Sequence, residues 1–392
     1  MAAQVEELLN ELEFLVDRSA TSDPRTKEIT TQVRELLQHI PDHEYLEGYL
    51  ASLLNDESAE LLLGNAVKKD PENTVAWKLL SDEFCKKGDF SMAHECLLSS
   101  LEYKKDNLVV LRNLSMVLRK LGKTPREKMV YTMEGLKVSK DALALDFGDP
   151  LSWYLVGNAY LSVFFTISHN KKDLEAALKA YGKSEVFQNE KVQAGIKIVK
   201  NSDLYFNRAE VLAYLQRYEQ AVEDYETAKV LDPGLKVDEA IYSLVRKVQV
   251  SFEFVQKKGN LKPKQIASLS AACGIQGSSI EDLKSGDLDG KESILNVRVV
   301  AHISVDTIVS LLVIDRDGNC AVLSIYSLDP GASSKIRIEK DKITLINPKL
   351  LRIQFKDCCY DVLQLETPAQ LFLNDEELKS SFAHASMEST SG

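Results

Sequence analysis

The chain has 392 residues, of which 44% are hydrophobic and 27% are charged, and its formal net charge is -11. This length suits two or three domains, and the apolar content is that of a folded globular protein. The acidic balance excludes a protein whose whole surface coats nucleic acid, so any RNA contact has to come from a local basic patch.

Metal, catalytic and membrane signals are missing from the sequence. The six cysteines lack CxxC spacing, and the six histidines are scattered. No GxSxG or P-loop motif occurs in a strand–turn–helix context, no basic segment with an apolar run opens the chain, and no stretch approaches the roughly 18–20 apolar residues of a membrane span. We therefore predict a non-enzymatic protein without metal or cofactor, in the reducing environment of the cytoplasm and nucleus.

Helical periodicity begins near the N-terminus. Apolar residues recur at helical spacing over residues 5–16 and 29–39, and the turn Ser22-Asp23-Pro24 separates the two segments. We predict two leader helices within residues 1–41.

Residues 42–258 repeat a helix–turn–helix pattern at about 34 residues. The clearest copy spans residues 202–233, where aromatic and alanine positions fit two antiparallel helices closed by Pro233. Weaker copies begin near residues 46, 74, 108 and 153, with insertions after Gly122 and Tyr160, and an amphipathic segment at 237–258 suits a terminal cap. This pattern predicts an all-α tetratricopeptide-repeat solenoid, which offers a groove to a peptide or protein partner.

Composition changes after Gly259. Residues 259–292 are rich in Gly, Ser and Lys and read as a linker, whereas residues 293–375 show the alternation of short strands around the hairpin turn Asp317-Gly318-Asn319. The strands are predicted at 297–303, 308–314, 321–326, 343–346, 350–355 and 360–365, with an irregular connection at Pro330-Gly331-Ala332-Ser333-Ser334. We predict a multidomain protein in which a small all-β OB-fold barrel follows the solenoid, and residues 376–392 form a disordered tail.

Four strings sharpen this assignment: NLSMVLRKL at 113–121, SWYLVGNAYLSVFF at 152–165, SDLYFNRAEV at 202–211 and AVLSIYSL at 321–328. Together they resemble the tetratricopeptide repeat protein five family, also called Strap or the stress-responsive activator, from about residue 46 to residue 373. The resemblance implies an adaptor for tubulin autoregulation, which recognises the N-terminal Met-Arg-Glu motif of nascent tubulin on translating ribosomes. Its further implied partners are an mRNA-decay adaptor and the deadenylase machinery.

The resemblance also implies an alternative function. Members of the family are described as nuclear stress-responsive transcription cofactors that scaffold an acetyltransferase coactivator, with DNA or chromatin contact through the OB-fold. Against base stacking by this barrel, its aromatic residues are few and mostly at core-like positions: Tyr326, Phe355, Tyr360 and Phe372. From the residues we favour a protein-docking or structural role for the barrel.

The first helix of each repeat supplies the inner, concave face, because steps of three and four residues keep side chains on one side. We hypothesise that Arg119 pairs with the peptide's glutamate, and that Asp203, with Glu210, takes its arginine or N-terminal amine. By resemblance, Arg119 and Asp203 match the family's peptide-contacting positions. The predicted groove consists of Arg112, Asn113, Met116, Arg119, Tyr154, Asn158, Asp203, Phe206, Asn207 and Glu210.

Two alternatives stand beside this groove. Inner-face charges also keep a solenoid soluble without binding anything. Binding of chaperone C-terminal tails is disfavoured, because Asp82 stands where an asparagine belongs and the fourth repeat supplies no cation. At the end of the solenoid, a run of four lysines is a candidate for ribosomal RNA contact: Lys257, Lys258, Lys262 and Lys264. A solvated linker explains this run equally well.

Overall fold

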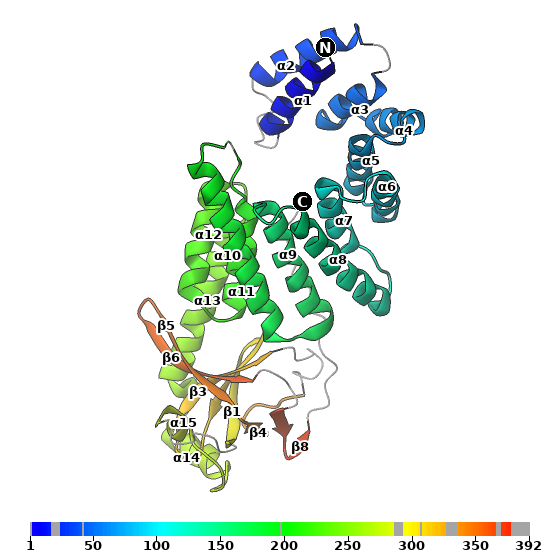
Figure 1. The fold of residues 1–392 in the computed structure, drawn as a ribbon. Helices are drawn as coiled ribbons and strands as arrows, with labels where there is room; N and C mark the ends of the chain where they lie inside the picture. Colours follow the sequence, from blue (N-terminus) through cyan, green and yellow to red (C-terminus); the bar gives the residue numbers. More distant parts are fainter. Residues whose placement is uncertain are drawn as a thin grey trace. The chain divides into compact units, whose positions relative to one another are not determined.

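The computed structural model describes residues 2–16, 24–40, 43–196, 198–285, 293–305, 308–326, 335–365 and 370–377. The chain divides into two compact units, Met1–Val163 with Gly182–Asn189, and Phe164–Tyr181 with Glu190–Gly392. Helices make up the first unit, and helices with a sheet make up the second (Figure 1). No helix in the described ranges has both the length and the apolar character that crossing a bilayer requires.

The leader helices of the first unit are α1 (Ala2–Val16) and α2 (Pro24–Leu37). Leu9 of α1 and Ile29 of α2 share one hydrophobic core with Leu46 of the next helix, α3 (Glu44–Leu53). The leader helices are therefore packed as part of the repeat array. Ser22 and Asp23 of the predicted turn lie outside the described residues.

Antiparallel helix pairs follow, as the repeat pattern predicts (Figure 1). Local signals start them: the side chains of Asn73, Asp89 and Asn107 each accept a hydrogen bond from the first turn of a helix. Thr124 and Glu127 form a capping box around Pro125. The bounds are α4 (Ala59–Lys69), α5 (Thr74–Lys86), α6 (Phe90–Tyr103), α7 (Leu108–Leu118), α8 (Pro125–Leu145) and α9 (Pro150–Val163).

The second unit begins with the insertion that the sequence places after Tyr160. Five residues form a π-helical turn, η1 (Phe164–Ser168), and His169 then takes a positive φ of 47° before α10 (Lys171–Gln193), which contributes to both units. The fifth repeat and the terminal cap follow as α11 (Ser202–Tyr214), α12 (Tyr218–Leu231) and α13 (Val237–Gln256).

The described strands form one sheet in the order β5-β6-β3-β2-β1-β4-β7-β8. All neighbours pair antiparallel except β3 and β6, which are parallel. The predicted strands are present, whereas β7 and β8 were not predicted, and β8 overlaps the start of the predicted tail. The bounds are β1 (Ile294–Val305), β2 (Ile308–Ile314), β3 (Cys320–Tyr326), β4 (Lys342–Ile346), β5 (Lys349–Phe355), β6 (Cys358–Leu365), β7 (Leu371–Leu373) and β8 (Glu376–Glu377).

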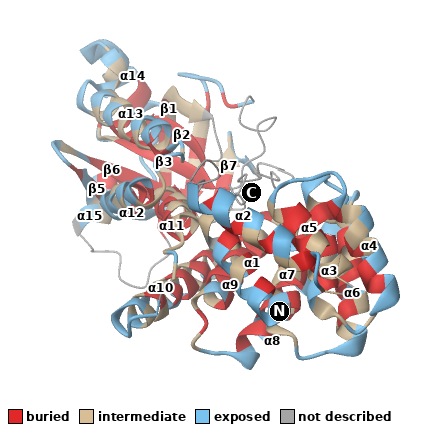
Figure 2. Cartoon of the chain, turned by 90° about the horizontal axis from the view of Figure 1, so that it is seen from above, coloured by how far each residue is buried: buried red, intermediate tan, exposed pale blue. Residues whose placement is uncertain are grey.

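One core joins the strands. Val299, Leu311, Leu323 and Leu363 belong to it and are fully buried, and β2 and β3 are buried along nearly their whole length (Figure 2). A strand is buried on both faces only when other parts of the chain pack on each face of its sheet. A second cluster explains this, because Leu312 packs with residues that precede the sheet. The predicted connection at 330–334 and the tail from 378 onward lie outside the described residues.

The predicted linker differs from the structure. Residues 259–285 include the end of η2 (Lys258–Asn260) and the helices α14 (Pro263–Ala271) and α15 (Ile280–Ser285), while 286–292 lie outside the described residues. Arg298 of β1 donates hydrogen bonds to the Ala272 carbonyl at 2.8 and 3.2 Å. The segment also adds a parallel bridge between Ser278 and Leu295.

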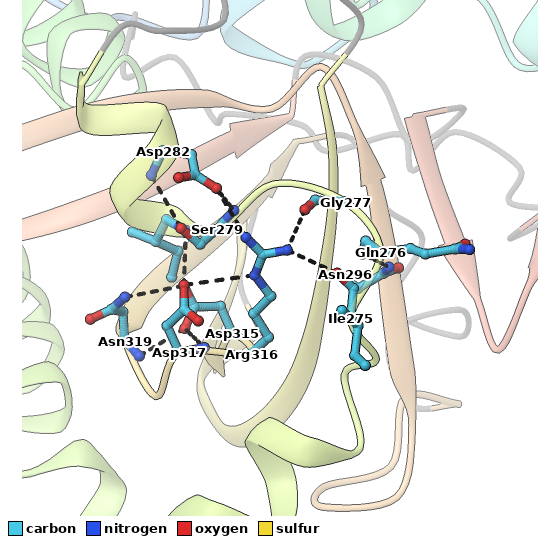
Figure 3. Close-up of polar contacts among 11 residues, drawn as sticks. Ile275, Gln276, Gly277, Ser279, Asp282, Asn296, Asp315, Arg316, Asp317 and Asn319 are labelled. Carbon is cyan, nitrogen blue, oxygen red and sulfur yellow. Dashed lines mark hydrogen bonds and ion pairs between the residues drawn. The ribbon is translucent and has the colours of Figure 1, made fainter.

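Arg316 holds the same segment from the β2–β3 turn (Figure 3). Its Nη1 donates to the carbonyls of Ile275 at 2.9 Å and Gly277 at 2.7 Å, and Asp315 accepts the backbone N–H of Ile280 at 2.8 Å. Gly277 has a φ of 99°, and a Cβ there would lie 2.5 Å from the Ile294 carbonyl oxygen. Only glycine fits this approach.

Within the second unit, the end of α11 is hydrogen-bonded to the sheet. Gln216 takes a φ of 60°, and its Nε2 donates to Ser324 Oγ at 2.8 Å. Gln364 Nε2 donates to Gln216 Oε1 at 3.3 Å and to the Tyr326 hydroxyl at 2.6 Å. The ring of Tyr214 meets that of Tyr326 edge to face at 5.2 Å. The fifth repeat and the sheet are therefore one packed body.

Candidate peptide-binding surface

The second repeat presents a closed ion pair. Lys78 and Asp82 lie one helical turn apart on α5, with Nζ 2.9 Å from Oδ2. Burial raises the pKa of the Asp82 carboxyl, although Lys78 acts in the opposite direction. Because the two charges satisfy each other, this pair offers little to an external ligand.

The third repeat carries the predicted cations. Arg112 of α7 donates to Asp149 Oδ2 at 3.3 Å, and Asp149 also accepts the Ser152 backbone N–H at 2.7 Å, so Arg112 joins two helices of the first unit. Arg119 occupies the C-terminal cap of α7 and is half-buried. Met116 is 37% exposed. Within the part of the chain that the structure describes, Arg112 Nε is buried without a hydrogen-bond partner, and so is Asn113 Nδ2.

The fourth repeat differs from the prediction. Tyr154 and Asn158 of α9, expected as open groove contacts, are 5% and 2% exposed. The first helix of this repeat is apolar along most of its length, and nine of its 14 residues are buried. A helix that is hydrophobic all round is packed on more than one side. These two side chains are part of the packing rather than accessible contacts.

The fifth repeat carries two carboxylates on one face of α11, since Asp203, Phe206 and Glu210 follow one another at helical spacing. Burial, with the neighbouring Asp232, raises the pKa of Asp203. Burial also raises the pKa of Glu210, which accepts a hydrogen bond from the Tyr225 hydroxyl. Phe206 packs edge to face on Tyr225, whereas the predicted contact Asn207 is only 3% exposed.

A hollow of about 420 Å³ adjoins Glu210 within the second unit. Glu210 and Ala213 of α11 line one side, Ser243 and Lys247 of α13 line another, and Ile303 of β1 lies at its end. Because Ala213 and Ser243 have small side chains, they leave this hollow open. A side chain entering from solvent would meet Glu210 there.

The lysine run divides into two pairs. Lys257 forms an ion pair with Glu253 at 3.1 Å, and Lys258 donates to the Gly318 carbonyl at 2.8 Å, so both have protein partners. Lys262 and Lys264 flank Pro263 at the start of α14 and are exposed. Of the four predicted lysines, this second pair is the more accessible to a ligand, because no side-chain ion pair holds it among the described residues.

The described residues contain no group of three or more His, Cys, Asp or Glu able to hold a metal ion. Tyr326, Phe355 and Tyr360 are buried, so none of them lies on an open face of the described barrel where an extended single strand could stack. Sequence reasoning missed Gln216, because a single glutamine at a repeat turn carries no signal for a contact more than a hundred residues away.

Family models and relatives agree with this architecture. The family model described as "Tetratricopeptide repeat protein 5 OB fold domain" matches residues 275–387, and a tetratricopeptide repeat model matches residues 202–235. Tetratricopeptide repeat protein 5 of Mus musculus is 30% identical over 367 residues, which cover 86% of this chain and 80% of the mouse protein. The chain belongs to the tetratricopeptide repeat protein 5 family.

The human relative gives the same result, since tetratricopeptide repeat protein 5 of Homo sapiens is 30% identical over 352 residues, 82% of this chain and 77% of that protein. Among solved structures, a thermophilic TPR protein of Thermus thermophilus is 17% identical with a TM-score of 0.42, over 52% of this chain and 97% of that chain. A member of the tetratricopeptide repeat protein 5 family is a TPR adaptor with an OB domain. TPR scaffolds are protein-interaction modules, and no catalytic family is indicated.

Proposed function

We propose that this protein recognises the N-terminal Met-Arg-Glu motif of nascent tubulin on translating ribosomes and promotes decay of tubulin mRNA through an mRNA-decay adaptor and deadenylases. The observation that carries the proposal is the pair of carboxylates on α11. Asp203 and Glu210 share one face, and among the described residues neither is paired with a basic side chain. A half-buried carboxylate without a cation is a site for one.

The motif has the complementary charges. Its arginine and its N-terminal amine suit Asp203 and Glu210, and its glutamate suits Arg119 of the first unit. The hollow beside Glu210 has room for a side chain. Lys262 and Lys264 are the residues of the lysine run that we assign to ribosomal RNA, and the expected location is the cytoplasm, with a nuclear pool.

The test is binding of a fluorescent peptide with a tubulin N-terminus. Arg119→Ala is expected to weaken binding about tenfold, because a charge-assisted contact is lost. A peptide with glutamine in place of the glutamate separates this contact from folding defects, since Arg119→Ala should not change its affinity. Unchanged affinity of Arg119→Ala for the native motif would reject the assignment.

Ribosome association tests the function itself. The intact protein is expected to co-sediment with ribosomes that expose a tubulin N-terminus, and the groove variants are expected to lose that association. Lys262→Glu with Lys264→Glu should reduce ribosome binding while leaving affinity for the free peptide unchanged. Chromatin retention without ribosome association would support the alternative, a nuclear stress-responsive transcription cofactor that scaffolds an acetyltransferase coactivator.

A further inference from the structure

A second cavity, of about 300 Å³, lies within the second unit and shares only Tyr214 with the lining of the α11–α13 hollow. Its walls come from η1, the start of α10, the end of α11 and the strands β3 and β6. None of its lining residues is among the predicted peptide contacts or the lysines assigned to the ribosome. This volume is at the lower end of the range for small-molecule sites, which begins at about 300 Å³.

Aromatic rings form the floor of the cavity. Phe164 meets Tyr214 edge to face at 5.5 Å, and Tyr214 meets Tyr326 at 5.2 Å. Each ring is held by its neighbour, and all three are buried. The exposed parts of these rings form an aromatic wall of the cavity, and such a wall favours a planar ligand.

One wall carries hydrogen-bonding groups of fixed orientation. Gln364 is 4% exposed, and its Nε2 is occupied by the Tyr326 hydroxyl and by Gln216. The Tyr326 hydroxyl accepts one of these bonds and keeps its own hydrogen to donate. Gln364 Oε1 has no hydrogen bond to any described residue. A donor and an acceptor therefore stand side by side, as the edge of a nucleobase requires.

The charged side chain that lines the cavity is a lysine. Lys171 lines it together with the imidazole of His169, and no carboxylate among the described residues does. Asp173 lies two residues after Lys171, and its Oδ2 accepts the hydrogen bond of the Ser168 hydroxyl. Lys171 is also the first residue of a 23-residue helix, whose N-terminus adds positive potential. An anionic group is favoured at this rim.

We propose that this cavity binds a mononucleotide, with the base against Tyr214 and Tyr326 and the phosphate at Lys171. The features of the ligand that the cavity recognises are a planar ring with polar edges and an anionic group joined to it. A free nucleotide and the terminal nucleotide of a single strand share this chemistry, so the experiment has to separate the two.

The experiment is calorimetric titration of the full chain with AMP, GMP, CMP and UMP, with adenosine and ribose 5-phosphate as partial ligands, and with a ten-nucleotide single strand. At least one mononucleotide is expected to bind saturably, and its nucleoside about tenfold more weakly, because the phosphate contact is lost. Absence of saturable mononucleotide binding overturns the proposal, including the case in which only the single strand binds.

Two neighbouring lysines provide a matched control. Lys171→Ala is expected to weaken mononucleotide binding about tenfold and to leave nucleoside binding unchanged, whereas Lys172→Ala, which is exposed and does not line the cavity, should change neither. Tyr326→Phe keeps the ring and should reduce discrimination among the bases. Equal effects of the two lysine variants would overturn the phosphate assignment and with it the proposal. Affinity for the tubulin peptide should be unchanged in Lys171→Ala.

Discussion

The ends of α5 and α11 share one backbone geometry and differ in the residue that adopts it. Beyond α5, Gly88 has a φ of 77°, its N–H donates to the Cys85 carbonyl at 3.0 Å, and Asp89 donates to Phe84 at 2.9 Å. Beyond α11, the same two bonds are made by Gln216, with a φ of 60°, and by Arg217. This is the usual left-handed helix ending, in which glycine is preferred.

The difference shows that the end of α11 has a second structural role besides closing the helix. Glycine adopts the left-handed region without steric cost, whereas a residue with a Cβ loses roughly 1–2 kcal/mol there. Gln216 is buried and hydrogen-bonded to Ser324 and Gln364 of the sheet. The backbone strain at Gln216 is offset by these buried hydrogen bonds, which attach the last repeat to the barrel.

The inner faces of the same two helices differ in charge. On α5 the Lys78 and Asp82 pair is closed at 2.9 Å, whereas Asp203 and Glu210 on α11 have no basic partner in the described structure. The second repeat therefore serves the packing of the array, whereas the fifth attaches the sheet and, as we propose, also binds the peptide.

The largest expected effect comes from Gln216→Leu, which keeps the positive φ and removes both hydrogen bonds. The buried Ser324 hydroxyl then loses its partner, so we expect a loss of about 3 kcal/mol in unfolding free energy, measured by urea denaturation. Gln216→Gly should cost less, by about 1 kcal/mol, because it relieves the strain. If the leucine and glycine variants were equally stable, strain at Gln216 would be refuted.

The charge contrast predicts a smaller effect on binding. Asp203→Asn should weaken a peptide beginning Met-Arg-Glu about tenfold, because a charge-assisted hydrogen bond is lost. Asp82→Asn should leave affinity within about twofold, since that carboxylate is already paired. Fluorescence polarisation compares the two, and a similar loss in both variants would contradict the division of roles.

Gly88→Ala tests the cost of a positive φ at a helix end that makes no contact with the barrel. A Cβ at Gly88 would meet no atom within 4 Å, so only the positive φ opposes it. We expect a loss of roughly 1 kcal/mol in the stability of the first unit, measured by thermal or urea unfolding, with peptide affinity unchanged. Unchanged stability of Gly88→Ala would show that the backbone of this turn relaxes to accommodate alanine.

The pH dependence of binding gives the smallest effect. Burial raises the pKa of Asp203 and of Glu210, so in the free protein both take up protons at a higher pH than usual. A bound cation favours the ionised form, so binding releases protons and affinity rises with pH until the free carboxyls are ionised. A few-fold loss is expected between pH 7 and pH 5, and titration in two buffers of different ionisation enthalpy measures the released protons. Asp203→Asn should flatten the profile.

Much of this fold was predictable because local patterns determine it. The alternation of β-branched residues located six strands, and caps such as Asn107 and Thr124 mark helix starts that periodicity had indicated. The short helices α14 and α15 were missed. Their sequence is polar, and long-range hydrogen bonds from Arg298 and Arg316 hold them in place. Composition does not reveal such contacts.

The candidate site was predicted less completely. Helical spacing puts Asp203, Phe206 and Glu210 on one face of α11, but the same rule proposed Tyr154 and Asn158, which are buried. Spacing gives the face of a helix and not what covers it. The hollow beside Glu210 depends on residues of α13 and β1, which no repeat pattern brings together.

The hydrogen bonds from Arg316 to carbonyls that precede β1 have a practical consequence for preparing fragments of the protein. A fragment starting at residue 293 would discard the carbonyls of Ile275 and Gly277 that the Arg316 guanidinium holds, and the Ile280 N–H that Asp315 accepts. Its β2–β3 hairpin would then expose apolar surface that α14 and the residues before it now cover. A barrel fragment therefore has to include residues 263–285, and protease nicking within that segment should be as damaging as cutting a strand.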